Sequence, residues 1–235
     1  MNFPDFSRSK ALNNVPQRKI QDKLSQVEAS QEKPEIKHFR MTAYNRYAES
    51  NIPLEYWDLK MEKDFHGDPR LYARYQTYIE DLKASYIKGD SVCFAGGHGL
   101  GKTMSGTCIL KKAVQKGYSA LYTTLSDIVN VLTQAGGEEK FLARRELNTV
   151  DFLMIDEFDS RFMPNENAAD LYARTLENVF RTRSQNKLPT LMCTNSPNMV
   201  EAFNGPLRNS IESLVNGHLK IFRVMPGEDF RSKKV

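Results

Sequence analysis

Short apolar runs along the chain alternate with longer stretches in which apolar residues recur at helical spacing. The apolar runs cover residues 91–95, 119–123, 150–155, 189–194 and 218–224. Strands buried on both faces of a parallel sheet are near-continuous apolar segments, and helices connect them. The alternation therefore predicts an α/β fold with a five-stranded parallel sheet between helices.

Helical spacing is clearest ahead of the first predicted strand. Asp68 can cap a helix there, and Pro69 suits its first position. One face of this helix is apolar, and it carries Leu71, Tyr75, Ile79, Leu82 and Tyr86. Gly89 and Asp90 are expected to end it. Further helices are expected over residues 103–116, 127–134 (with Ser126 as cap), 138–147, 165–186 and 207–215.

The N-terminal part of the chain has a weaker pattern. Residues 1–40 are polar and mixed in charge, and a helix over residues 18–32 would carry a thin apolar stripe of Ile20, Leu24 and Val27. Two interpretations stay open. The segment is either a weakly ordered arm or helix that docks on a partner, or a solvated leader without a role. Residues 41–64 are expected to form an aromatic-rich connector.

A glycine-rich stretch after the first predicted strand carries the strongest chemical signal. It consists of Gly96, Gly97, His98, Gly99, Leu100, Gly101, Lys102 and Thr103, and Met104 leads on into a helix. The stretch fits G-x-x-x-x-G-K-[ST] in the strand–loop–helix setting that this phosphate-binding motif requires. Its backbone N–H groups and the helix N-terminus attract an anion. We therefore expect these residues to bind ATP, with Lys102 at the β- and γ-phosphates and Thr103 as a ligand of Mg²⁺.

Two further strand ends carry polar residues. The third predicted strand ends in Asp156 and Glu157, and the fourth is followed by Asn195. Ligand-binding groups gather at the carboxyl ends of parallel strands. We expect Asp156 to hold Mg²⁺, Glu157 to orient and activate the attacking water, and Asn195 to sense the γ-phosphate or hold that water.

The amino-acid composition is typical of a globular protein and does not by itself indicate a function. The chain has 235 residues, 40% of them hydrophobic and 26% charged, as in an ordinary globular protein. No apolar run reaches the length of a membrane span, and the first residues lack the core of a signal peptide, so a cytoplasmic protein of a bacterium or of a phage in its host is expected. A net charge of +4 permits contact with nucleic acid without requiring it. Cys93, Cys108 and Cys193 lie in apolar segments, which indicates buried free thiols rather than a zinc site.

The order and spacing of these motifs resemble the AAA+ ATPases of the DnaC/DnaI helicase-loader and IstB group. The resemblance rests on the phosphate loop, Ile155-Asp156-Glu157, Thr194-Asn195-Ser196 and Asp229-Phe230-Arg231-Ser232, with further similarity at residues 52–57 and 123–128. It covers roughly residues 50–235. It implies an AAA+ P-loop NTPase fold with a short N-terminal extension and no separate lid domain. Residues 1–45 would form a partner-binding arm, partly disordered or helical, and residues 46–235 the ATPase domain.

The same resemblance implies roles for single residues. Asn195 matches the sensor I position, and Arg231 matches the sensor II arginine that contacts the nucleotide in its own subunit. An arginine finger acting on the neighbouring subunit is expected after the fourth strand, where Arg208 is the candidate. Related loaders carry several arginines in this region, so an ordinary surface position for Arg208 remains open.

The resemblance also suggests where DNA would bind. The two helical pieces between the second and third strands look like the extra helix of the initiator and loader proteins, which faces DNA. Basic residues lie there and on the phosphate-loop helix: Lys140, Arg144, Arg145, Lys111, Lys112 and Lys116. Such residues either bind phosphates without sequence preference or form a solvated charged face.

The function that the resemblance implies is a Mg²⁺-dependent ATPase acting as a helicase loader. Its partners would be a replicative hexameric DNA helicase, single-stranded DNA and further copies of itself in an ATP-dependent oligomer, and no membrane. The alternative is an IstB-like ATPase that assists a transposase. Glu157 argues against a module that uses ATP only as a clamp, and no acceptor pocket or lid suggests a metabolic kinase.

Overall fold

The computed structural model of the chain describes residues 9–159, 166–196, 208–209, 212 and 219–224, with the backbone alone for 166–173. The sheet consists of β1 (Ser91–Ala95), β2 (Ala120–Thr124), β3 (Phe152–Asp156), β4 (Thr190–Thr194) and β5 (Leu219–Arg223). All pairs are parallel, in the order β2-β3-β4-β1-β5. The predicted parallel sheet is confirmed, and each strand begins and ends within two residues of its expected bounds. None of the described helices is long and apolar enough to cross a membrane.

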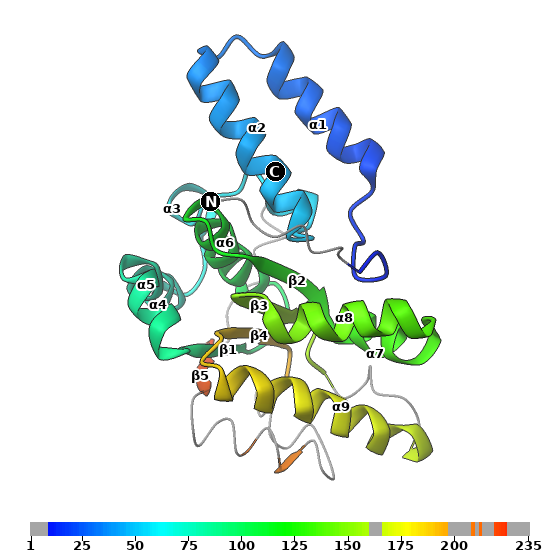
Figure 1. Cartoon of the computed structure of the whole chain (residues 1–235). Helices are drawn as coiled ribbons and strands as arrows, with labels where there is room; N and C mark the ends of the chain where they lie inside the picture. The colour runs from blue at the N-terminus through cyan, green and yellow to red at the C-terminus, as the bar shows by residue number, and fades with distance from the viewer. Residues whose placement is uncertain (1–8, 160–165, 197–207, 210–211, 213–218, 225–235) are drawn as a thin grey trace.

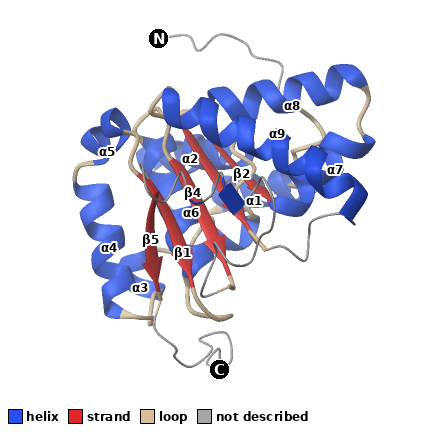
Figure 2. Ribbon diagram, turned by 90° about the horizontal axis from the view of Figure 1, so that it is seen from below, coloured by secondary structure: helices blue, strands red, loops and turns tan. Residues whose placement is uncertain are grey.

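Helices cover both faces of the sheet (Figures 1 and 2). Side chains of a strand alternate between faces, and the core is divided accordingly. Val92 and Phe94 pack with α6 (Lys102–Gln115) and α4 (Pro69–Glu80), whereas Cys93 and Ala95 pack on the opposite side. The helices of that opposite side are α7 (Leu125–Gln134), α8 (Gly137–Thr149) and α9 (Glu166–Gln185). The three cysteines are buried free thiols, as expected.

Most predicted helices are confirmed, and two local details are wrong. Asp68 caps α4 as expected, but the helix breaks at Asp81, whose carboxylate accepts the N–H of Ala84 and starts α5 (Leu82–Lys88). A short acidic side chain that caps a new turn competes with continuation of the old one. The cap of α7 is Thr124 and not Ser126, since Thr124 and Asp127 form a reciprocal capping box. Gly89 ends α5 at φ +71°.

The predicted helix at residues 207–215 lies mostly outside the described residues. Within it, residues 208, 209 and 212 are helical.

The N-terminal segment is a helical hairpin that belongs to the core. It consists of α1 (Gln17–Ala29) and α2 (Pro34–Glu49), which lie side by side above α6 in Figure 1. The connector was expected to begin at residue 41. That bound is wrong, because residues 41–49 belong to α2. Tyr44 and Tyr47 on this helix pack against Trp57, with ring centroids 5.1 and 6.1 Å away. The remaining connector contains the 3-10 turn η1 (Leu54–Tyr56) and α3 (Met61–Asp64).

Residues 9–16, ahead of the hairpin, are also packed rather than solvated. Leu12 is buried in the core, and its carbonyl accepts a hydrogen bond from Asn51 Nδ2 at 2.6 Å. Ser9 donates from its hydroxyl to Glu139 at 2.6 Å and from its N–H to Glu146 at 3.2 Å. The contacts of Ser9 tie the segment to α8 and that of Leu12 ties it to Asn51, so a solvated leader does not describe residues 9–16.

Arg183, in the last turn of α9, is a buried cation that joins three chain segments. It is 1% exposed. Its guanidinium donates to the carbonyls of Leu147, Val150 and Pro189 at 2.7–2.9 Å and to the Thr190 hydroxyl at 2.9 Å. Burial lowers the pKa of Arg183 to about 9. The sequence pattern of α9 did not predict this arrangement, because the carbonyls come from the ends of other elements.

Replacing Arg183 with methionine is expected to destabilise the fold by about 3 kcal/mol or more, since several buried carbonyls lose their donor. The free energy of unfolding in urea measures this. Arg181→Met is the matched control on the same helix. Arg181 forms an exposed ion pair with Glu177, whose loss costs at most about 1 kcal/mol. Similar losses in both variants would contradict the role given to Arg183.

Candidate nucleotide-binding site

The glycine-rich loop joins β1 to α6 and has the backbone that a phosphate loop needs. Gly99 and Gly101 adopt φ values of +69° and +80°, which side chains disfavour. A Cβ on Gly101 would also come within 2.5 Å of the Phe65 ring. Gly101 has no side chain to cap α6, and the N–H groups at the start of a helix face an anion bound there. A Cβ on Gly97 would meet only Leu100, at 3.7 Å, so the loop is open there. This geometry fits a bound phosphate group.

Lys102 reaches across the loop from the start of α6. It is 6% exposed, and its ammonium donates to the carbonyl of Gly97 and to Asn195 Oδ1, the latter at 3.0 Å. Asn195 directly follows β4, which pairs with β1. The structure thus brings together the predicted lysine and the predicted asparagine from positions 93 residues apart.

Asp156 lies at the end of β3 on the other side of the loop. Its carboxylate accepts hydrogen bonds from the Glu157 N–H at 2.8 Å and from the Tyr122 hydroxyl at 3.0 Å, and the Thr103 side chain lies beside it. Burial raises the pKa of Asp156 above its ordinary value, and its polar neighbours Glu157 N–H, Tyr122 and Thr103 oppose that rise. The two predicted Mg²⁺ ligands, Thr103 and Asp156, are therefore direct neighbours.

This pair of oxygen ligands fits Mg²⁺ in one particular way. Among the described residues there is no group of three or more His, Cys, Asp or Glu that could hold a metal ion. Mg²⁺ in nucleotide sites needs no such group, since it takes one or two protein oxygens, phosphate oxygens and water. The hydroxyl of Thr103 and the carboxylate of Asp156 match that requirement.

Glu157 stands in an unusual backbone conformation directly after β3. Its φ is +49°, in the left-handed region that costs a residue with a side chain roughly 1–2 kcal/mol. The next residue fixes the turn, because the Phe158 N–H donates to the Cys193 carbonyl of β4 at 2.8 Å. The Glu157 side chain is exposed, whereas its neighbours Asp156 and Phe158 are buried. The carboxylate of Glu157 thus lies at the solvent-exposed edge of the sheet, next to Asp156.

The remaining predicted site residues divide into three groups. Leu100 is buried and Met104 packs against the core, so both support the loop, while His98 is exposed. Arg208 is exposed and forms an ion pair with Glu212 one helical turn away, at 3.1 Å. Arg231 lies outside the described residues. Among the described contacts of Arg208, none is with a residue of the loop.

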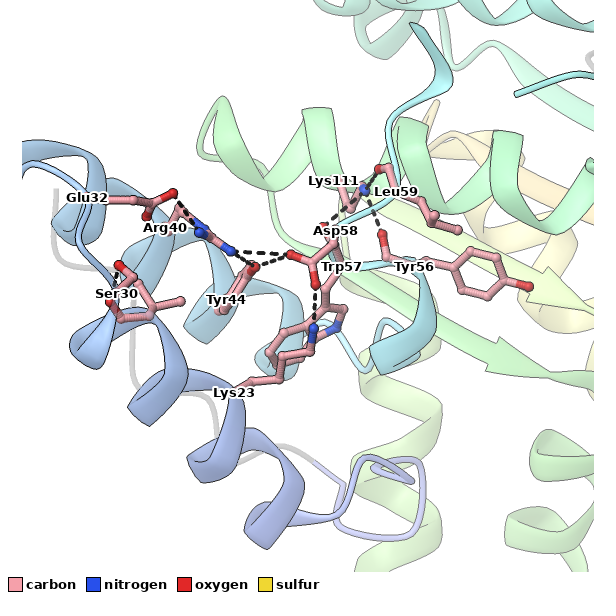
Figure 3. Close-up of polar contacts among 11 residues, drawn as sticks. Lys23, Ser30, Glu32, Arg40, Tyr44, Tyr56, Trp57, Asp58, Leu59 and Lys111 are labelled. Carbon is pink, nitrogen blue, oxygen red and sulfur yellow. Dashed lines mark hydrogen bonds and ion pairs between the residues drawn. The ribbon is translucent and has the colours of Figure 1, made fainter. Parts of the chain in front are cut away.

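Hydrogen bonds of Lys111 and Asp58 hold the connector to the neighbouring helices (Figure 3). Lys111, on α6, is 7% exposed and donates to the carbonyls of Tyr56 at 2.6 Å, Trp57 at 3.4 Å and Leu59. Lys111 is thus a buried structural cation, and its predicted availability for DNA is wrong. Asp58 accepts hydrogen bonds from Lys23 of α1 and from the Tyr44 hydroxyl of α2. The connector therefore joins the hairpin to the helix that begins at the phosphate loop.

Two aromatic residues of the site had not been predicted from the sequence. Tyr122 of β2 donates to Asp156, and Phe65 covers Gly101. Burial, followed by the charge of Asp156, raises the pKa of Tyr122, which keeps its hydroxyl protonated. Tyr122 could be recognised as a residue of the second predicted strand, but the sequence does not show that this strand lies beside β3.

Comparison with known proteins decides the family. The sequence model of the family described as IstB-like ATP binding protein matches residues 42–189. The chain belongs to this IstB-like family. The match spans the connector, the phosphate loop, Asp156 and Glu157. A search of the curated proteins found no match.

Solved structures similar to this IstB-like protein share its fold. A crystal structure of DnaI is 16% identical, with a TM-score of 0.58 over 76% of this chain and 94% of that one. A crystal structure of the DnaC helicase loader is 16% identical, with a TM-score of 0.59 over 74% and 100%. The replication initiator DnaA bound to AMPPCP and single-stranded DNA is 18% identical, with a TM-score of 0.56 over 75% and 51%, so this chain spans about half of it. The fold is that of the AAA+ P-loop NTPases.

Proposed function

We propose that this IstB-like ATPase is a helicase loader, which binds and hydrolyses Mg²⁺-ATP in order to place a replicative hexameric helicase on single-stranded DNA. The observation that carries the proposal is the convergence of Lys102, Thr103, Asp156 and Asn195 at the carboxyl ends of β1, β3 and β4. The likeness of the whole domain to the DnaC helicase loader and to DnaI supports the choice of partner.

In the proposed reaction the chain's own groups mainly position and stabilise charge. Lys102 and the first N–H groups of α6 hold the phosphates, and Thr103 and Asp156 hold Mg²⁺, which neutralises charge that develops on the phosphate oxygens. Glu157 orients the attacking water and accepts its proton. Asn195, already hydrogen-bonded to Lys102, is placed to contact the γ-phosphate or that water.

A second subunit would complete the site. Arg208 is exposed and lies in a short helical piece, so in an ATP-dependent oligomer it can reach the phosphates of a neighbouring copy. Arg231 would contact the nucleotide from within the same chain. DNA would meet the basic residues of α8, where Arg144 is exposed and Lys140 and Arg145 are partly exposed.

The second candidate is an ATPase that assists a transposase. The family description of an IstB-like ATP binding protein is the observation that favours it. The two candidates share the nucleotide site and differ in the partner, so the test has to read the partner.

The N-terminal hairpin is the proposed partner-binding arm, and its surface allows a clean test. Deleting residues 1–45 would remove buried core residues such as Leu12 and Tyr44. Substitutions on the surface of the hairpin avoid this loss. Two large apolar side chains of α2 are exposed there, Ile36 at 47% and Phe39 at 61%. They lie three residues apart and so share one face of the helix. This face is available to bind a helix or groove of a partner.

The immobilised full chain is expected to capture the replicative helicase of its host, and not a transposase from the same genome, when ATP is present. Ile36→Ser combined with Phe39→Ser is expected to weaken capture by roughly tenfold to a hundredfold, because two apolar anchors are lost. Ile87→Ser is the matched control, since Ile87 is 59% exposed on α5, away from the arm. Capture of a transposase alone would establish the second candidate. Helicase capture unaffected by the double substitution would remove the arm from the interface.

A further inference from the structure

The hydroxyl of Tyr122 forms a hydrogen bond with the predicted magnesium ligand Asp156. It donates to Asp156 Oδ2 at 3.0 Å, while Asp156 Oδ1 accepts the Glu157 N–H at 2.8 Å. A buried carboxylate needs such donors, and each one also restricts the direction in which the carboxylate faces. With both oxygens engaged, the plane of the Asp156 carboxyl group is fixed before any metal arrives.

The strand register explains how Tyr122 reaches this carboxylate. On β2 it lies directly opposite Met154 of β3, and Asp156 follows Met154 by two residues. Residues two apart on a strand share one face, so Tyr122 and Asp156 are diagonal neighbours on the same face of the sheet. That face also carries α6, and therefore Thr103. A phenol is long enough to span this diagonal, whereas a threonine or serine at position 122 is not.

A second tyrosine, on the connector, lies near the same carboxylate. Tyr56 in η1 interacts electrostatically with Asp156 and with Tyr122. Its carbonyl is held by Lys111 of α6 at 2.6 Å, so its backbone is anchored to the phosphate-loop helix (Figure 3). The connector thus lies near Asp156, whereas the hydrogen bond to its carboxylate comes from Tyr122 of β2.

We propose that Tyr122 is a positioning residue of the magnesium site: by holding Oδ2 of Asp156 it directs the carboxylate toward the Thr103 hydroxyl, where Mg²⁺ binds. The inference rests on the proposed function, since it assumes that Thr103 and Asp156 hold Mg²⁺. Partners that hold a metal ligand in place affect metal affinity strongly, typically by tenfold to a hundredfold when they are removed.

The test is a magnesium titration of the full-length Tyr122→Phe variant. Phenylalanine keeps the ring in the core and removes only the hydroxyl. The Mg²⁺ concentration that half-activates ATP hydrolysis is expected to rise about tenfold, while kcat at saturating Mg²⁺ and the affinity for ATP in EDTA stay within about twofold of the wild type. The same titration is read by binding of a non-hydrolysable ATP analogue, which does not depend on turnover.

Tyr86→Phe is the matched control. The Tyr86 hydroxyl also donates to a carboxylate, Asp151 Oδ1, at 2.7 Å. Asp151 precedes β3, so this pair lies at the end of the strand opposite to Asp156. Tyr86→Phe is expected to leave the magnesium dependence unchanged. An unchanged dependence in Tyr122→Phe, or an equal rise in both variants, would overturn the inference.

The outcomes also separate this inference from the proposed function. If the wild type binds the analogue in a Mg²⁺-dependent way without hydrolysing ATP, the ATPase proposal fails and the binding titration still decides the role of Tyr122. If the wild type hydrolyses ATP and Tyr122→Phe has the wild-type magnesium dependence, only the role of Tyr122 fails.

Discussion

Lys102→Ala is expected to abolish ATP binding. The ammonium group is buried at the phosphate loop, where it donates to the Gly97 carbonyl and to the Asn195 side chain. A charge-assisted contact to phosphate in such a place is stronger than a neutral one, and the neighbouring Asn195 also loses its partner. Affinity for ATP should therefore fall by at least about a hundredfold, which is about 3 kcal/mol. Isothermal titration calorimetry or a fluorescent ATP analogue measures it.

The control for this prediction lies on the same helix. Lys112 is partly exposed, ten residues after Lys102, in the last turn of α6. Lys112→Ala removes the same charge and the same number of atoms far from the loop, and ATP affinity should stay within about twofold. Binding retained by Lys102→Ala would remove the basis for treating residues 96–103 as a phosphate loop.

Most of this fold could be predicted because the spacing of apolar residues within a short segment identifies it as a helix or a strand. Apolar runs gave the five strands, and the motif before Lys102 gave the loop between the first strand and its helix. The carboxyl-end rule placed Asp156 and Asn195 near the loop without any knowledge of strand order. Each of these steps needs only residues that are close in sequence.

The features that were missed depend on contacts between distant segments. The aromatic residues of the connector looked like a loop, but Tyr44 and Tyr47 complete a helix and pack on Trp57. Lys111 looked like a surface lysine because helical spacing cannot reveal that three carbonyls converge on it. Tyr122 required both the strand order and the register. Where the polar end of a long side chain is buried, contacts with distant segments therefore decide its role, and the local sequence pattern does not reveal it.

Glu157→Gln is expected to bind ATP as the wild type does and to lose hydrolysis. Glutamine keeps the length and the backbone N–H, which donates to Asp156, but it cannot accept a proton from water. General bases contribute about 10²–10⁴-fold to such reactions, so kcat should fall by at least a hundredfold while the affinity for ATP stays within about twofold. Phosphate release under steady-state conditions and analogue binding together measure the two effects. Glu138→Gln, which changes an exposed acid of α8, is expected to alter neither.

The backbone conformation of Glu157 allows a second, independent test of its catalytic role. A left-handed φ of +49° is unfavourable for glutamate and costs glycine almost nothing. Glu157→Gly relieves that cost of roughly 1–2 kcal/mol but adds freedom to the unfolded chain worth about 0.4–1 kcal/mol, so stability should rise by between zero and about 1.6 kcal/mol. The variant is nevertheless expected to be as inactive as Glu157→Gln. A fold that tolerates glycine together with a reaction that does not would mean that the side chain serves catalysis, whereas normal turnover in either variant would exclude Glu157 as the base.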